Sequence, residues 1–367
     1  MIALQGLTPE RLASSVPALS LPEARRVVSA VHRGWNLDGP VRDLRRASLE
    51  ALRARAGLPP LERLEERASA IDPFVKFLFR TGDGLLVEAV RIPLEVSGRF
   101  SVCVSSQVGC ALACAFCATG RLGLRRNLEA WEIVEQARAV RLGLDRSRRE
   151  RIRGVVFQGM GEPLANLDAV LEAIAVLTHP CALAVDARAI TVSTAGLPDG
   201  IRRLGREARK VRLALSIGSA DPGKRRRLMP VERAHPLEEL LEACVEHART
   251  TGYRPMWAYT LLEGVNDGEE DARALASLAL SFAARAGMPP RISLLAYNAI
   301  DEPGRDPFRR SSPERETAIR DALREAGVFT KRRYSGGSDV GAACGQLAGI
   351  RATPASTEHL ANPVWRR

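Results

Sequence analysis

The strongest constraint on the fold is a regular alternation of short apolar runs and helix-length amphipathic segments after residue 100. Six runs rich in β-branched residues are typical of strands: 100–106, 154–159, 189–194, 211–216, 256–261 and 291–296. Amphipathic segments of helix length lie between them, as in 128–144, 167–177, 236–250 and 271–287. Repeated strand–helix units imply a parallel sheet. We therefore expect an α/β fold, a partial (β/α)6 barrel, with its chemistry at the carboxyl ends of the strands.

The region before this alternation has a different character. From about residue 7 to 60 the pattern is helical, with a helix start at Thr8-Pro9-Glu10 and a helix end near Gly57. A hairpin turn is predicted at residues 81–84. We expect a small N-terminal all-helical domain over residues 1–85, a core barrel over 86–350, and a polar, loosely held C-terminal tail over 351–367.

The composition indicates a soluble, cytoplasmic globular protein. The 367 residues are 46% hydrophobic and 26% charged, which is enough to bury a large core. Polar residues interrupt the opening segment, so it does not resemble a secretion signal, and no apolar run is long enough to span a bilayer. The formal charge of +11, with basic clusters from residues 121, 146, 224 and 331, favours a polyanionic partner. An Arg-rich solvated surface would give the same pattern.

Three cysteines follow the first strand at the spacing C-x3-C-x2-C. They are Cys110, Cys114 and Cys117, in the run CALACAFCATG. A total of seven cysteines in a reducing compartment favours metal or redox chemistry over a disulfide framework. Four ligands close a zinc or iron–sulfur site, whereas three leave one coordination position for a reacting molecule. An open zinc site and inert buried cysteines are the alternatives.

This spacing resembles that of the radical S-adenosylmethionine superfamily, as do Phe116 before the third cysteine and the segment GMGEPL after the second strand. The resemblance implies a radical SAM barrel and a [4Fe-4S] cluster held by Cys110, Cys114 and Cys117, with S-adenosylmethionine on the fourth iron. It also implies cofactor contacts from residues at the strand ends, which are Gly161, Glu162, Ser193, Ser216 and Asn298. Helix caps and Asx-turns would use the same hydroxyl and amide side chains.

Longer phrases resemble the RlmN/Cfr family of radical SAM RNA methyltransferases over about residues 85 to 350. They include VVFQGMGEPLANL, RAITVSTAGLPDGI, YTLLEGVND and SGGSDVGAACGQLAG. The resemblance implies methylation of an adenine ring carbon, most of all C2, in rRNA or tRNA. It implies that Cys344 carries the methyl group as a methyl-cysteine intermediate, and that Cys103 releases the product through a transient disulfide with Cys344. Glu88 matches the family's proposed proton acceptor.

The resemblance further implies RNA as partner, an electron donor protein such as flavodoxin, no membrane association, and a monomer. Two departures stand out: Gly218 replaces a histidine usual in the family, and the segment SGGSDV before Cys344 is less acidic than expected. Cys181 and Cys244 are interpreted as packing residues. Two other functions stay open. One keeps the fold and cofactor with C8 specificity or another substrate, and one is a non-catalytic RNA-binding protein whose cysteines hold metal or sense redox state.

Overall fold

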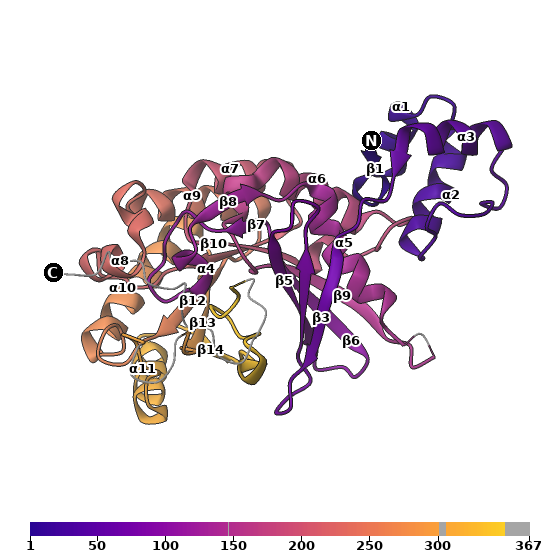
Figure 1. The fold of residues 1–367 in the computed structure, drawn as a ribbon. Helices are drawn as coiled ribbons and strands as arrows, with labels where there is room; N and C mark the ends of the chain where they lie inside the picture. Colours follow the sequence, from indigo (N-terminus) through magenta and orange to yellow (C-terminus); the bar gives the residue numbers. More distant parts are fainter. Residues whose placement is uncertain (146, 301–305, 349–367) are drawn as a thin grey trace.

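The computed structural model describes residues 1–348 except 146 and 301–305, so the predicted C-terminal tail lies outside the described residues (Figure 1). The N-terminal region forms a lobe beside the main body. Its helices are α1 (Pro9–Ser15), α2 (Leu21–His32) and α3 (Arg46–Arg55), and the short strands β1 (Ile2–Ala3) and β2 (Ala56–Gly57) pair beside them. The Thr8 hydroxyl caps α1, which confirms the predicted helix start.

A ten-stranded sheet forms the body, in the order β14-β13-β12-β11-β10-β9-β6-β5-β4-β3. From β6 to β14, neighbouring strands run parallel. These strands are β6 (Arg99–Val104), β9 (Arg151–Phe157), β10 (Ile190–Thr194), β11 (Arg212–Ser216), β12 (Met256–Leu261), β13 (Arg291–Ala296) and β14 (Thr330–Arg333). All six predicted strands are confirmed, and β14 adds a seventh parallel strand.

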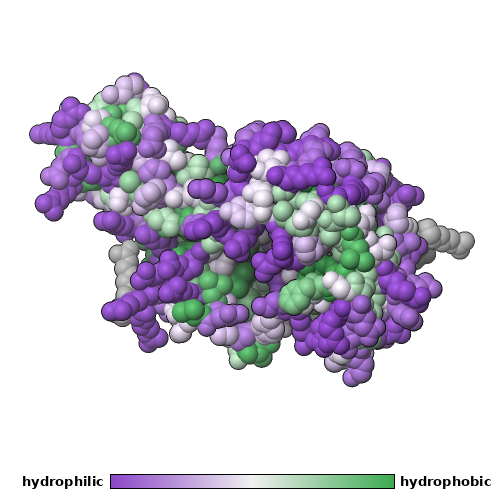
Figure 2. Space-filling view, turned by 180° about the vertical axis from the view of Figure 1, so that it is seen from behind, coloured by the Kyte–Doolittle hydropathy of each residue, from purple (hydrophilic) through white to green (hydrophobic). Residues whose placement is uncertain are grey.

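Helices follow one another around the outer side of the parallel strands (Figure 1). They are α5 (Ala130–Leu142), α6 (Leu167–Thr178), α7 (Pro198–Glu207), α9 (Leu237–Thr251), α10 (Glu269–Ala286) and α11 (Pro313–Glu325). Left-handed glycines Gly252 and Gly287 end α9 and α10, because only glycine adopts this conformation without strain. Seen from behind, hydrophilic residues cover most of the surface (Figure 2). Among the described residues, no helix combines the length and apolar character that a bilayer crossing requires.

Three antiparallel strands extend the sheet beyond β6: β3 (Glu62–Ala68), β4 (Val75–Arg80) and β5 (Leu86–Pro93). β4 and β5 form the predicted hairpin. Phe77 and Phe79 of β4 are buried in the core of the body. The last helix of the N-terminal region, α3, ends at Arg55, and residues 62–80 contain the strands β3 and β4. Residues 1–85 are therefore not all-helical, contrary to the prediction from the sequence. The expected division at residues 85 and 86 falls in the turn between two strands that pair in one sheet.

A loop after β14 returns the chain to these antiparallel strands. The turn between β3 and β4 is tied to it twice: Asp72 accepts a hydrogen bond of 2.8 Å from the Gly337 N–H, and Asp339 accepts one of 2.8 Å from the Ala70 N–H. Figure 1 shows this loop, in yellow, between β14 and β5. The loop therefore closes the gap between the last parallel strand and the antiparallel strands.

Candidate active site

The three motif cysteines lie on one loop at the carboxyl end of β6. The strands β7 (Gln107–Gly109) and β8 (Leu124–Asn127) pair at its base, and the short helix α4 (Ala118–Arg121) begins after Cys117. The loop is compact, since the Cys117 N–H donates to the Cys114 carbonyl at 3.2 Å. A side chain at Gly120 would place its Cβ 2.9 Å from the Cys114 backbone. The local backbone thus keeps the three cysteines on one compact loop.

Burial raises the pKa of the Cys110 thiol to about 12 and also raises the pKa values of Cys114 and Cys117. Neighbouring thiols of the motif raise the pKa of Cys110 and Cys114 further. As the side chains stand, no three His, Cys, Asp or Glu residues of the described chain are placed to hold a metal ion. The donor set itself, three thiols on one loop, fits an iron–sulfur cluster with one iron left open.

The segment after β9 packs against the entrance of the cysteine loop. Gly161 has a φ of +99°, and a side chain there would place its Cβ 2.5 Å from the Cβ of Gln107. The Gln107 side chain accepts a hydrogen bond of 2.8 Å from the Glu162 N–H. Only glycine satisfies both the backbone conformation and the space at this position. Gly161 therefore lets the backbone turn beside the cysteine loop.

Glu162 is a buried carboxylate beside the motif cysteines. It accepts hydrogen bonds from the N–H groups of Ala195 (2.8 Å) and Leu164 (3.0 Å). Burial raises the pKa of Glu162 to about 7, although these two donors oppose the shift. Its negative charge contributes to the raised pKa of Cys110 and Cys114. Glu162 thus joins the loop after β9 to the loop after β10, next to the thiols.

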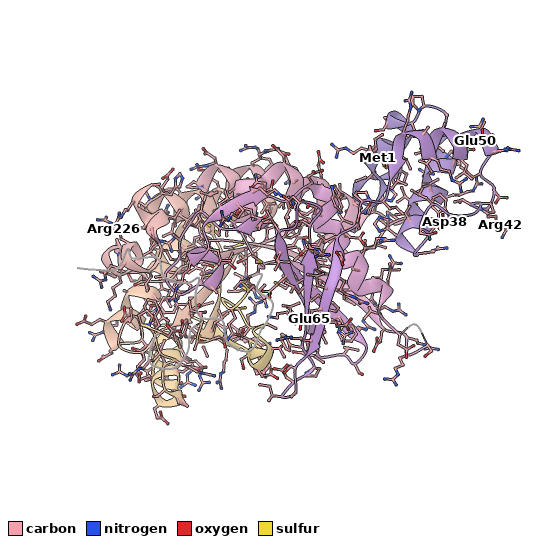
Figure 3. The ribbon with its side chains drawn as sticks, in the orientation of Figure 1. Met1, Asp38, Arg42, Glu50, Glu65 and Arg226 are labelled. Carbon is pink, nitrogen blue, oxygen red and sulfur yellow. The ribbon has the colours of Figure 1, made fainter. Side chains whose placement is uncertain are left out.

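Arg225 is a buried charged residue near the motif cysteine Cys114. The sequence did not indicate this position, because Arg225 belongs to the basic cluster KRRR. It lies on α8 (Pro222–Leu228), fully buried, and forms an ion pair of 2.8 Å with Glu232. Its guanidinium donates to the carbonyls of Ala195 (2.8 Å) and Ser216 (3.0 Å). Arg225 therefore holds the carboxyl ends of β10 and β11 together. Its neighbour Arg226 is exposed at the periphery (Figure 3).

Two further predicted cofactor contacts lie on the same strands. Ser193 is buried near the end of β10, and Ser216 is partly buried as the last residue of β11. Gly218 follows with a φ of +69°. A side chain at Gly218 would place its Cβ 2.5 Å from the Met229 sulfur. Glycine therefore suits both the conformation and the space at residue 218, where the resemblance predicted a histidine.

Cys103 and Cys344 line one cavity of about 100 Å³, to which Cys117 also contributes. Burial raises the pKa of Cys103 to about 12, the Cys344 thiol adds to this rise, and Arg333 opposes it. In the structure all seven cysteines, each within the described residues, are free. The structure therefore brings the two predicted catalytic thiols to one cavity without a bond between them.

Asn298, predicted to contact the cofactor, lies against the loop that carries Cys344. Its side-chain amide donates to the Cys344 carbonyl and to the Ser335 hydroxyl, both at 3.2 Å. The Ser335 hydroxyl in turn accepts a hydrogen bond of 2.8 Å from the Cys344 N–H. Asn298 and Ser335 together fix the backbone of Cys344.

Glu88 lies on β5, buried beneath the same loop. Its carboxylate forms an ion pair of 3.1 Å with Lys76 and accepts a hydrogen bond of 2.9 Å from the Ala348 N–H. The loop is also bonded to the residue that follows the last motif cysteine, because the Ala118 N–H donates to the Gly345 carbonyl at 2.7 Å. The structure therefore brings the Cys344 loop, Glu88 and the cysteine motif together at one edge of the sheet.

Comparison with known proteins agrees with this geometry. Residues 104–276 match the family model of the radical SAM superfamily. The chain resembles the crystal structure of a radical SAM methyltransferase from Sphaerobacter thermophilus, with 36% identity and a TM-score of 0.84 over 95% of this chain and 100% of that one. The fold and the site thus define a radical SAM methyltransferase, and members of this superfamily use a [4Fe-4S] cluster and S-adenosylmethionine.

Sequence relatives narrow the class. The chain is 57% identical to a probable RNA methyltransferase of Sorangium cellulosum, over 93% of this chain and 91% of the relative. It is 45% identical to the dual-specificity RNA methyltransferase RlmN of Syntrophobacter fumaroxidans, over 77% and 78% respectively. This chain belongs to the RlmN/Cfr family of radical SAM methyltransferases. The predicted fold class, family, enzyme class and cofactors are confirmed.

Proposed function

We propose that this protein methylates an adenine ring carbon, C2 in the first place, in rRNA or tRNA, and that Cys344 carries the methyl group. The hydrogen bond of 2.7 Å between the Ala118 N–H and the Gly345 carbonyl is the observation that carries this proposal. It holds the residue after Cys344 against the residue after Cys117. RNA as substrate is supported by the names of the relatives and by the formal charge of +11.

In this proposal Cys110, Cys114 and Cys117 would hold the cluster, which would supply an electron to S-adenosylmethionine. The contacts to S-adenosylmethionine come from the strand ends already described, at Gly161, Glu162, Ser193, Ser216 and Asn298. Glu162 accepts hydrogen bonds from the N–H groups of Ala195 and Leu164, and in this proposal its carboxylate would also accept from the ammonium group of S-adenosylmethionine. Arg225 keeps the strand ends of this site in register.

In this proposal, Cys344 and the loop around it transfer the carbon to the base. Its cavity is walled by Val90, Ile92 and Val156, apolar side chains that exclude water from a reactive carbon. Cys103 lines the same cavity from β6, which supports the proposal that its sulfur attacks the sulfur of Cys344, breaks the bond between that sulfur and the transferred carbon, and releases the methylated base. Glu88, which anchors the loop through Ala348, is the proposed proton acceptor.

The test is product analysis. Reconstituted enzyme is incubated without oxygen with S-adenosylmethionine, a reductant and total RNA, and the digested nucleosides are weighed. We expect 2-methyladenosine from the wild type, none from Cys344→Ala, and a covalent protein–RNA adduct from Cys103→Ala. Wild-type yields from Cys344→Ala would disprove the methyl-cysteine route. An 8-methyl product instead of the 2-methyl product would assign the alternative C8 specificity, because the two nucleosides separate by chromatography.

The remaining partners are proposed on the family resemblance and the composition. We propose a cytoplasmic monomer without membrane association that receives electrons from a donor protein such as flavodoxin. Light scattering after gel filtration tests the oligomeric state. Replacing the chemical reductant with reduced flavodoxin tests the donor, and absence of turnover with flavodoxin would count against it.

A further inference from the structure

Tyr334 is an exposed aromatic side chain at the mouth of the cavity that contains Cys103 and Cys344. It lines this cavity, yet 67% of the residue is open to solvent. Among the described residues, Tyr334 and Phe329 are the exposed large aromatic side chains. Single exposed hydrophobic side chains are common on protein surfaces, so it is the place of Tyr334 at this cavity that marks it as a candidate for binding.

The Tyr334 ring is fixed in place rather than free to rotate. Its hydroxyl donates to Asp72 at 2.8 Å, and the ring meets the edge of Phe74 with centroids 6.0 Å apart and planes at 68°. Asp72 is itself held, because it accepts hydrogen bonds from the N–H groups of Phe74 (3.1 Å) and Gly337 (2.8 Å). A ring immobilised in advance loses little conformational entropy when a ligand stacks on it.

A second, independent feature of the same cavity points to a polar ligand. Arg333 lines the cavity, and its buried Nη1 has no hydrogen-bond partner in the described chain. Buried donors of this kind are normally paired, since an unpaired one costs free energy. The ligand that completes this site therefore combines a flat ring with a hydrogen-bond acceptor. A nucleobase and its phosphate have both properties.

We propose that Tyr334 is a stacking platform for the RNA base that approaches Cys344, with Arg333 donating to an acceptor of the same nucleotide. This inference rests on the proposed function, because it assumes RNA as the substrate. Enzymes that modify a base must first take it out of its stack, and an aromatic side chain replaces part of the stacking that is lost. The position of Tyr334 beside Cys344 would then hold the base at the cavity mouth.

The experiment uses the reconstituted holoenzyme without oxygen and an RNA stem-loop with 2-aminopurine at one unpaired loop position. The fluorescence of this base analogue falls when it stacks. We expect the wild type to quench the probe, and Tyr334→Ala to bind it roughly tenfold more weakly without quenching. Tyr334→Phe keeps the ring and should stay within about twofold of the wild-type affinity, because stacking depends on the ring.

Phe329→Ala is the matched control. Phe329 is 80% exposed and precedes β14, at the amino end of the strand whose carboxyl end leads to Tyr334. We expect this variant to bind and quench as the wild type does. For Tyr334→Ala we also expect a raised KM for RNA.

Suppose that the wild type methylates RNA and that Tyr334→Ala binds and quenches the probe as the wild type does. That result would overturn the stacking role of Tyr334 but not the proposed function. That outcome would leave the exposed ring as a surface for another partner, such as an electron donor protein. A wild type that makes no methyladenine would instead overturn the proposed function, so the two failures are distinguishable.

Discussion

The carboxylate of Glu88 accepts a hydrogen bond of 2.9 Å from the N–H of Ala348, a residue 260 positions further along the chain. This bond anchors the end of the loop that carries Cys344 to the antiparallel strand β5. The opposite side of the loop is held by Asn298 and Ser335. Glu88 therefore has a structural role that is separable from its proposed role as a proton acceptor.

Removing Glu88 should destabilise the protein. Lys76, its ion-pair partner, has a side chain only 12% exposed, so Glu88→Ala leaves a nearly buried charge without a counter-charge. We expect the free energy of unfolding to fall by about 3–5 kcal/mol, measured by urea denaturation. The double variant Lys76→Met, Glu88→Leu removes both charges and should recover most of that loss. Methylation by this stable double variant at the wild-type rate would contradict the proton-acceptor role.

Arg225 should be needed both for stability and for cofactor binding. Arg225→Met leaves Glu232 buried and unpaired and frees the carbonyls of Ala195 and Ser216, so the unfolding free energy should fall by about 3–5 kcal/mol. Arg225→Lys keeps the charge but not the fork of donors, and should weaken S-adenosylmethionine binding in equilibrium dialysis. The exposed neighbour provides the control, with Arg226→Ala within about 0.5 kcal/mol of the wild type. Equal losses at both positions would refute the positioning role.

Introducing at residue 218 the histidine that the resemblance predicts should destabilise the protein. Gly218 has a φ of +69°, and a Cβ there would come 2.5 Å from the Met229 sulfur. We expect Gly218→His to lower the unfolding free energy by about 1–3 kcal/mol. Adding Met229→Ala should relieve the close contact but not the backbone strain, so the double variant should not reach wild-type Tm. A single variant with unchanged Tm and tighter S-adenosylmethionine binding would show that the position tolerates histidine.

His32 should make the protein less stable in mild acid. It lies fully buried at the end of α2, neither ring nitrogen has a hydrogen-bond partner in the described chain, and burial lowers its pKa to about 3. In the unfolded chain it takes up a proton at about pH 6.5, so below that pH the unfolded state binds one proton more than the folded state. Above pH 6.5 His32 is neutral in both states, so it does not lower the free energy of unfolding there. Below that pH the free energy of unfolding falls by up to about 1.4 kcal/mol per pH unit as the pH drops towards 3.

The comparison of His32→Leu with the wild type isolates this contribution. Urea denaturation at pH 7.5 and pH 5.5, on equally reconstituted proteins, should show a larger loss of stability in the wild type than in the variant. An identical loss in both would mean that His32 becomes protonated without cost in the folded state. The charge of the Arg138 guanidinium also lowers the pKa of His32, so it acts in the same direction as burial.

Local patterns in the sequence were enough to predict the architecture of the parallel sheet. The alternation of apolar runs and amphipathic segments predicted the six parallel strands. The spacing of apolar residues and the length of each run distinguish a strand from a helix directly. The hairpin at residues 81–84 and the cap at Thr8 also depend on neighbouring residues alone. The cysteine spacing and the phrases around Gly161 and Cys344 indicated the family for the same reason: each is a contiguous signature.

Only the tertiary structure could decide which distant residues meet. Arg225 belongs to a run of four basic residues that is indistinguishable from a solvated cluster, yet it is buried against Glu232 and two strand ends. The bond between Glu88 and Ala348, and the fixed ring of Tyr334 on the Asp72 turn, join segments more than 250 residues apart. Such contacts leave no local trace in the sequence, because they arise only when the sheet curls and its last loop reaches back to its first strands.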